Sequence, residues 1–268
     1  MEHWSPDRVW ARIEALAREE PGGILATDGD GTLWSGDVGE DLFHGFLRRG
    51  PVLPAALEAL GREARDHHLS DAGTGPDIAR ELYSAYLAGG FPEERICEIM
   101  TWCFAGWRRN DARAFAAEVV AGADLASRWQ AEVVQVLERA RAAGIRVILV
   151  SASPFDVVAE VGALMGFGEE DVVAARPLYE GDVMLPEVDR PIPYAAGKVS
   201  RLRMRAGEGH VAYAAFGDNV FDIALLASAR LGVAVRPKPR LAGRAHEVAG
   251  LVQLERGAPP SLVPRKGR

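Results

Sequence analysis

The chain has 268 residues, of which 48% are hydrophobic, and a formal net charge of −7 at pH 7. A chain of this size can bury a large core and is longer than one average domain, so we expect one domain with a substantial insertion. Because it has no excess of Lys or Arg to neutralise polyanions, we expect no nucleic-acid partner and no membrane partner. It also lacks a long apolar run and a signal-like N-terminus, which predicts a cytoplasmic protein.

Four short apolar runs end at polar, Gly-rich or Pro-rich turns, which is the pattern of buried strands. They cover residues 24–27, 147–150, 211–216 and 231–235. Because helical patterns alternate with them, we predict an α/β fold with a Rossmann-like parallel sheet. Ligands of such sheets bind beyond the carboxyl ends of the strands, so the polar residues after three of these runs should converge on one edge. After the second run, Ser153 is expected to cap a helix that begins at Pro154.

More than a hundred residues separate the first two predicted strands, and their pattern is mostly helical. The helical patterns cover residues 53–65, 77–88, 92–105 and 111–120. Such a long connection predicts a helical cap domain at residues 40–125, inserted into a core of residues 1–39 and 126–268. A turn-rich segment at residues 176–193 predicts a small β-hairpin. The tail from Ala258 onward is expected to be loose.

Two carboxylates, Asp28 and Asp30, follow the first predicted strand in the sequence Asp-Gly-Asp-Gly-Thr. Carboxylates this close repel each other, and Mg²⁺ is the usual hard cation that makes crowded oxygens tolerable, so we expect a metal here. Asp218 and Asp222 stand one helical turn apart after the third strand. Asp218 could bind the metal directly, and Asp222 could orient its ligands.

Ser151 follows the second strand and could offer its hydroxyl to phosphoryl oxygens, while Lys198 could offer a fixed positive charge. Together with a carboxylate nucleophile and a proton donor, these are the groups that phosphoryl transfer needs. Ser153 is a competing phosphate contact, although helix capping suits it better. Lys198 has the alternative of an ordinary solvated lysine, and Trp34 is either a lid over the leaving group or part of the core.

These residues form four motifs, which in chain order are Asp28 with Asp30, Ser151, Lys198, and Asp218 with Asp222. In that order they resemble the motifs of the haloacid dehalogenase superfamily, and specifically of its phosphoserine-phosphatase-like branch. The resemblance implies that Asp28 is the nucleophile, that Asp30 is the general acid and base, and that Ser151 and Lys198 complete the catalytic set. It also implies that Mg²⁺ is the cofactor. The metal residues would then be Asp28, Asp30 through its backbone carbonyl, Asp218 and Asp222. The dehalogenases that name the superfamily lack the second carboxylate, so carbon–halogen hydrolysis is disfavoured.

The predicted function is therefore a Mg²⁺-dependent phosphatase that hydrolyses a small phosphomonoester through an aspartyl-phosphate on Asp28. In phosphoserine phosphatases a Glu shortly after the first motif and an Arg in the cap hold the substrate. The nearest acidic residues here are Asp37 and Glu40, and with Asn219 they are the predicted substrate contacts. No cap Arg stands in a comparable context, so phosphoserine itself is not predicted.

Two alternative functions are compatible with much of the same evidence from the sequence. A phosphomutase or phosphotransferase would use the same core residues and differ only in the group that accepts the phosphoryl. A non-catalytic protein that binds a phosphate ligand would need only the fold, and the intact set of acidic residues argues against it. The sequence predicts neither the physiological substrate nor an oligomeric state.

Overall fold

A computed structural model describes residues 1–207 and 209–257. The tail from Ala258, predicted to be loose, lies outside the described residues. The chain divides into two compact units, and each is described on its own. The first comprises Met1–Ser35, Arg128–Val147 and Gly209–Arg268, and the second comprises Gly36–Ser127 and Ile148–Glu208.

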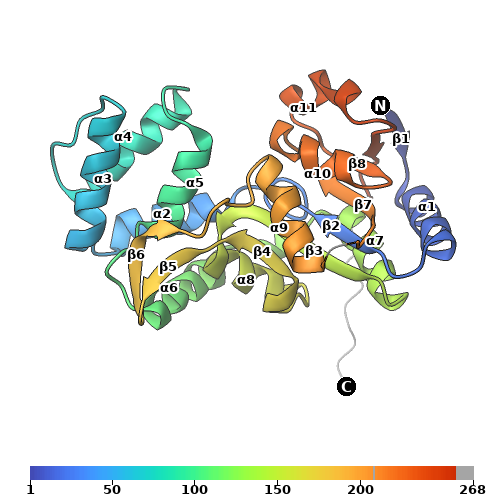
Figure 1. The fold of residues 1–268 in the computed structure, drawn as a ribbon, viewed down its shortest axis with the longest axis horizontal. Helices are drawn as coiled ribbons and strands as arrows, with labels where there is room; N and C mark the ends of the chain where they lie inside the picture. The colour runs from blue at the N-terminus through green and yellow to red at the C-terminus, as the bar shows by residue number, and fades with distance from the viewer. Residues whose placement is uncertain (208, 258–268) are drawn as a thin grey trace. The chain divides into compact units, whose positions relative to one another are not determined.

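Parallel strands form the centre of the first unit, in the order β1-β9-β8-β7-β2 (Figure 1). Their bounds are Glu2–Trp4 for β1, Ile24–Thr27 for β2, Ala212–Gly217 for β7, Gly232–Val235 for β8 and Val252–Leu254 for β9. Every residue of β2, β7 and β8 is buried. Strands that are buried on both faces read as continuous apolar runs, which is why the sequence predicts these three.

Four α-helices in the described part of the first unit accompany these strands (Figure 1). They are α1 (Pro6–Glu19), α7 (Ala131–Ala142), α10 (Ile223–Ser228) and α11 (Pro239–Gly243). The first helix begins where Ser5 accepts a hydrogen bond from the N–H of Arg8 at 3.3 Å and Pro6 takes the first helical position. It packs against α7 and β7, and α10 packs against β7 and β8.

A long strand, β3 (Arg146–Pro154), starts in the first unit and continues into the second, where it pairs in parallel with β4 (Val172–Ala175). The predicted helix cap at Ser153 is wrong. The strand runs on to Pro154, and helix α8 (Phe155–Leu164) begins without a side-chain cap. Because a residue before proline avoids the α region, Ser153 stays extended, and its N–H donates to the Ser151 hydroxyl at 3.0 Å.

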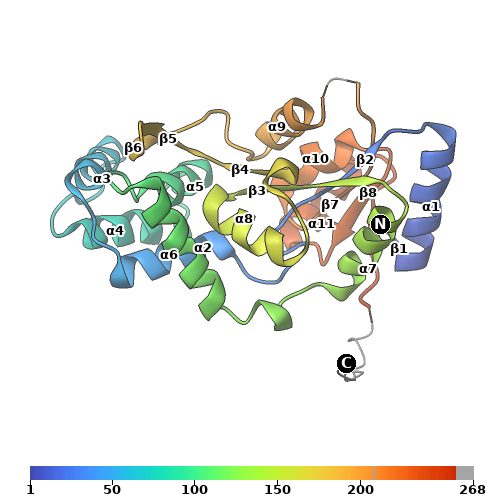
Figure 2. The ribbon, with the colours of Figure 1, turned by 90° about the horizontal axis from the view of Figure 1, so that it is seen from below.

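The described chain between β2 and β3 contains only helices, from α2 to α7, so the predicted α/β fold with an inserted helical region is confirmed. Those of the second unit, drawn blue to green in Figure 2, are α2 (Val38–Arg49), α3 (Pro54–Asp66), α4 (Gly75–Leu87), α5 (Glu93–Trp102) and α6 (Arg109–Gly122). The second helix packs against α4, α5 and α6. Residues 40–125 all fall in this unit, and their assignment as a cap with those boundaries stays a prediction.

The predicted hairpin is present as β5 (Pro177–Glu180) and β6 (Val183–Val188), which pair in antiparallel fashion. The segment before α6 makes backbone hydrogen bonds with β6. The N–H of Gly106 donates to the Met184 carbonyl at 2.8 Å, and the N–H of Met184 donates to the Trp107 carbonyl at 2.9 Å. Helix α9 (Ala196–Ala206) follows the hairpin. Within the described part of the chain, no helix is both long and apolar enough to cross a membrane.

We expect the buried carboxylate of Glu98 to stabilise the second unit. This α5 side chain is 4% exposed and makes ion pairs with Arg95 and with Arg190, the latter at 2.7 Å. Breaking a buried pair costs about 3–5 kcal/mol, and the exposure of Arg190 reduces this, so Glu98→Ala should lower the free energy of unfolding by ~2 kcal/mol. Urea denaturation measures it, with the exposed Glu94→Ala as control. Equal stability of the two variants would contradict the expectation.

Candidate active site

Asp28 and Asp218 leave the sheet at the same edge. Strands β2 and β7 are parallel neighbours with Thr27 opposite Phe216, and each ends just before one of these aspartates. The N–H of Asp28 continues the ladder by donating to the Phe216 carbonyl at 3.0 Å. The structure therefore brings together two of the strand ends that the sequence predicts to converge.

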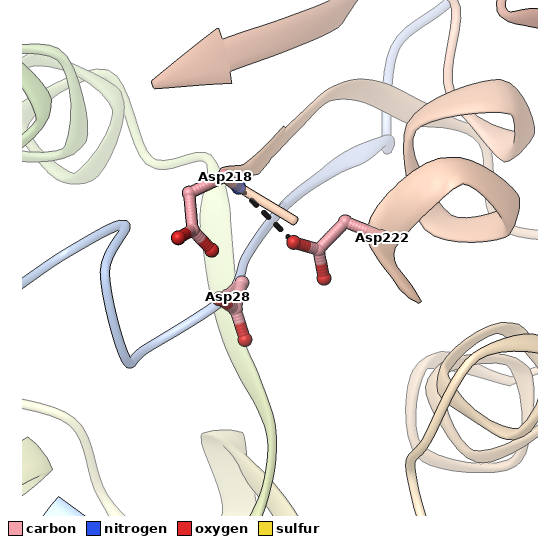
Figure 3. A group of neighbouring side chains, drawn as sticks. All are labelled: Asp28, Asp218 and Asp222. Carbon is pink, nitrogen blue, oxygen red and sulfur yellow. Dashed lines mark hydrogen bonds between the residues drawn. The ribbon is translucent and has the colours of Figure 1, made fainter. Parts of the chain in front are cut away.

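Three carboxylates gather at this edge, as Figure 3 shows: Asp28, Asp218 and Asp222. One oxygen of each lies within 4.8 Å of the others. The exposed fractions of these residues are 5%, 2% and 1%, respectively. Like charges this close and this shielded from water destabilise one another unless positive charge and N–H donors compensate them.

Two glycines make room for the three carboxylates. Gly31 has a φ of 81°, which favours glycine, and a Cβ there would lie 2.3 Å from an Asp218 carboxylate oxygen. A Cβ on Gly217 would lie 2.5 Å from the Cβ of Asp222. Both positions therefore require the absence of a side chain, the first one for two separate reasons.

Asp222 holds the turn that carries Asp218. Its Oδ2 accepts a hydrogen bond from the N–H of Asp218 at 3.0 Å (Figure 3). The same oxygen accepts from the N–H of Asn219 at 2.9 Å. The Asn219 side chain accepts from the N–H of Val220 at 2.7 Å and so caps the short 3₁₀ helix of residues 220–222. A contact of Asn219 with substrate stays a prediction.

The hydroxyl of Thr32 lies between two of the carboxylates. Its Oγ1 is 3.1 Å from Oδ2 of Asp28 and 3.4 Å from Oδ1 of Asp218, and the residue is fully buried. A single hydroxyl proton here restrains the Asp28 carboxylate. This role of Thr32 is not predicted from the sequence, where the residue stands out only as the end of the Asp-Gly-Asp-Gly-Thr motif.

Asp30 is positioned by a tryptophan. The indole N–H of Trp34 donates to Oδ1 of Asp30 at 2.8 Å. Trp34 itself is fully buried, edge-on to the ring of Trp129 with centroids 6.0 Å apart, so of its two predicted roles the core placement is the one observed. The carboxylate of Asp30 is not part of the group of three, which leaves the predicted metal contact to its backbone carbonyl.

Lys238 is a charged neighbour that the sequence analysis misses. Its Nζ lies 3.0 Å from Oδ2 of Asp218, and its backbone N–H donates to the Asp218 carbonyl at 2.8 Å. Lys238 stands in the Pro-rich turn Arg-Pro-Lys-Pro that follows β8. A lysine between two prolines beyond a central parallel strand is the signal that could have found it, because such strand ends face the ligand edge.

The donor set fits a hard divalent cation. It consists of carboxylate oxygens, which Mg²⁺ prefers, and three carboxylates carry more negative charge than the one ammonium of Lys238 can balance. Asp28 and Asp218 are the residues that could hold the ion, and Asp222 fixes their geometry through the backbone.

The other predicted site residues belong to the second unit. Ser151 lies in β3 and is 1% exposed, and Lys198 lies in the first turn of α9 and is 5% exposed. A lysine this buried is uncommon, so the solvated alternative for Lys198 does not hold.

Asp37 caps α2 by accepting from the N–H of Glu40 at 2.9 Å. Burial raises the pKa of Tyr83, and the hydrogen bond of its hydroxyl to Glu40 raises it further.

Residues 25–227 match the family model of the haloacid dehalogenase-like hydrolases. A protein with unknown function from Bordetella pertussis Tohama I has a similar structure, with 22% identity, a TM-score of 0.65, and coverage of 87% of this chain and 98% of that one. A functionally unknown protein from Anaerococcus prevotii DSM 20548 has 14% identity and a TM-score of 0.63, covering 91% and 90%. At these identities the likeness shows the fold alone.

A probable phosphoserine phosphatase from Vibrio cholerae is also similar, with 16% identity and a TM-score of 0.49, covering 86% of this chain and 60% of that one. A likeness at this level carries no argument about the substrate. No curated protein matches the chain.

The ammonium of Lys238 and a bound cation compete for the same oxygen of Asp218. We therefore expect Lys238→Met to raise the affinity for Mg²⁺ by up to about 5-fold, because a half-exposed ion pair contributes up to ~1 kcal/mol. Isothermal titration of the protein with Mg²⁺ measures this without reference to activity. Lys238→Arg, which keeps the charge, is the control, and an unchanged or lower Mg²⁺ affinity in Lys238→Met would contradict the competition.

Proposed function

Because the chain belongs to the haloacid dehalogenase-like hydrolases, we propose that it is a Mg²⁺-dependent phosphatase that hydrolyses a small phosphomonoester through an aspartyl-phosphate on Asp28. One observation carries the proposal. Asp28 is a buried carboxylate at a strand end, restrained by Thr32 and grouped with Asp218 and Asp222, and a second carboxylate follows two residues later. Such a group supports a fixed nucleophile beside a cation.

In the first half of the reaction, the Asp28 carboxylate attacks phosphorus in line with the ester oxygen, and the bond from phosphorus to that oxygen breaks. Asp30 gives its proton to the leaving alkoxide. In the second half, Asp30 takes a proton from water while the water oxygen attacks phosphorus. This step breaks the bond from phosphorus to Asp28, releases inorganic phosphate, and restores the carboxylate of Asp28 and the protonated form of Asp30. The hydrogen bond that the Trp34 indole donates to Asp30 supports the role of Asp30, because it orients this carboxylate separately from the group of three carboxylates.

Asp28, Asp218 and the backbone carbonyl of Asp30 would hold Mg²⁺. When bound, the ion neutralises charge on the phosphoryl oxygens in the transition state. Asp222 would keep Asp218 in place through its two backbone hydrogen bonds.

Ser151 and Lys198 are proposed to stabilise the transferred phosphoryl group through a hydroxyl and a positive charge. Their burial supports functional roles, since neither is an ordinary surface side chain. Residues 40–125 are proposed as the cap that selects the substrate, with Asp37, Glu40 and Asn219 as substrate contacts. The hydrogen bond between Tyr83 and Glu40 supports a fixed orientation of that carboxylate.

Replacing the nucleophile tests the chemistry. We expect Asp28→Asn to lower phosphate release by about 10³-fold or more, because an amide cannot form the covalent intermediate. Removing the metal with EDTA should abolish release by the wild-type protein, and added Mg²⁺ should restore it. The measurement is inorganic phosphate released from a panel of phosphomonoesters that includes phosphoserine, with thermal melting of both proteins as the control for folding.

Product analysis separates the alternatives. Phosphate that appears on an added acceptor instead of in solution would identify a phosphotransferase or phosphomutase. Full activity in Asp28→Asn would overturn the nucleophile, and a folded wild-type protein that binds these esters without releasing phosphate would indicate a binding role.

The hydrogen bond from Trp34 should matter for proton transfer. Trp34→Phe removes the indole N–H from Asp30, and a hydrogen bond to a charged group contributes about 1.5–3 kcal/mol, so kcat should fall by about 10-fold or more while KM changes little. Trp129→Phe is the matched control, because it alters the neighbouring ring without removing a donor to Asp30. An equal loss of kcat in both variants would mean that packing, and not the hydrogen bond, is responsible.

A further inference from the structure

A cavity of about 380 Å³ opens on the second unit, and none of the predicted site residues lines it. Strand β4 and the hairpin ends form one side of it, and α9 forms the other, with Arg201 and Arg205 four residues apart on the same helix face. Arg176, which follows β4, and Asp189, which follows β6, complete its charged lining. Three guanidinium groups therefore face this cavity beside a single carboxylate.

The carboxylate of Asp189 is already engaged by one of the arginines. Arg201 donates from Nη1 to Oδ2 of Asp189 at 2.9 Å and from Nη2 to its carbonyl at 2.7 Å. Its Nε donates to the Pro191 carbonyl at 2.6 Å, and its side chain is only 16% exposed. Arg201 and Asp189 thus form a fixed, neutral part of the wall, and the positive charge that remains comes from the other two arginines.

Arg176 and Arg205 lie close enough to repel each other. Burial lowers the pKa of Arg176 below its ordinary value, and the positive charge of Arg205 lowers it further. Arg176 is held in place by the ring of Phe155, whose centroid is 3.3 Å from the guanidinium carbon. Arg205 donates to the backbone carbonyl of Glu170 at 3.3 Å, which is a neutral partner.

The acidic groups near Arg176 are shared with a further arginine. Asp156 and Glu169 face Arg176, and both also form ion pairs with Arg113, at 3.5 Å and 3.2 Å. The region holds four guanidinium groups, of Arg113, Arg176, Arg201 and Arg205, and three carboxylates, of Asp156, Glu169 and Asp189, in a chain whose net charge is −7. A local excess of positive charge at a cavity is the arrangement that binds anions.

We propose that this cavity binds a small organic oxyanion with two negative charges, a phosphate ester or phosphonate being the fitting class, between Arg176 and Arg205. Guanidinium groups suit such oxyanions because they donate two parallel hydrogen bonds. The volume exceeds the need of a bare ion and lies in the range of small-molecule sites. The side chains of Val173 and Met204 give the wall apolar surface for the organic part of the ligand.

Binding in the absence of metal tests the proposal independently of catalysis. Inorganic phosphate and a non-hydrolysable alkyl phosphonate are titrated calorimetrically into the full chain with EDTA at low ionic strength. We expect Arg205→Gln to weaken binding by about 10-fold or more, as the loss of a charge-assisted hydrogen bond predicts. Arg203→Gln is the matched control, because Arg203 is an exposed residue of the same helix outside the cavity and its variant should bind like the wild type.

Arg205→Lys keeps the charge and should retain part of the affinity, which guards against a variant that fails for reasons of folding. Tighter binding of the phosphonate than of phosphate supports an organic ligand, and equal binding supports free phosphate as the occupant of the same anion site. If wild-type protein binds neither compound, or if Arg205→Gln and Arg203→Gln bind alike, the cavity is not an anion site.

Discussion

Electrostatic repulsion among three buried carboxylates is the constraint around which the first unit is arranged. Asp28, Asp218 and Asp222 place oxygens within 4.8 Å of one another where little water reaches them. Such a group persists only if the fold supplies donors and positive charge, and only if the backbone leaves no freedom for the side chains to separate. The first requirement is supplied by the backbone N–H groups that donate to the Asp222 carboxylate, by the hydroxyl of Thr32 and by the ammonium of Lys238.

The parallel sheet supplies the second requirement. Adjacent parallel strands end at the same edge, so the pairing of β2 with β7 brings Asp28 and Asp218 together although 190 positions separate them along the chain. Gly31 then lets the two turns approach to a distance that any side chain would prevent, and Gly217 leaves room for Asp222 within its own turn. Strand pairing is stabilised by apolar burial away from the edge, so the free energy that holds the carboxylates together comes from the core and not from the site.

The sequence predicts features that depend on local pattern or on strand order, and it fails where a contact depends on tertiary structure. Strand β2 matches its predicted bounds because four buried residues end at an unmistakable turn. Strands β1 and β9 escape prediction because three residues carry no periodic signal. The cap at Ser153 fails because a favourable capping residue is overridden when a strand continues through it. Lys238 is missed because its partner lies 20 positions earlier, beyond any local pattern.

The two carboxylates of the first motif are identical in chemistry and only two positions apart in sequence, yet their surroundings differ in a way that suits the separate roles proposed for them. Asp28 is buried and restrained by a hydroxyl, which suits the proposed role of a nucleophile that must stay deprotonated and aligned. Asp30 is half-buried and held through one oxygen by an indole N–H, an arrangement that leaves it oriented yet within reach of water. A general acid that later acts as a base must exchange its proton with water during each cycle. The positive φ of Gly31 turns the chain immediately after Asp30, so one local backbone conformation produces both environments.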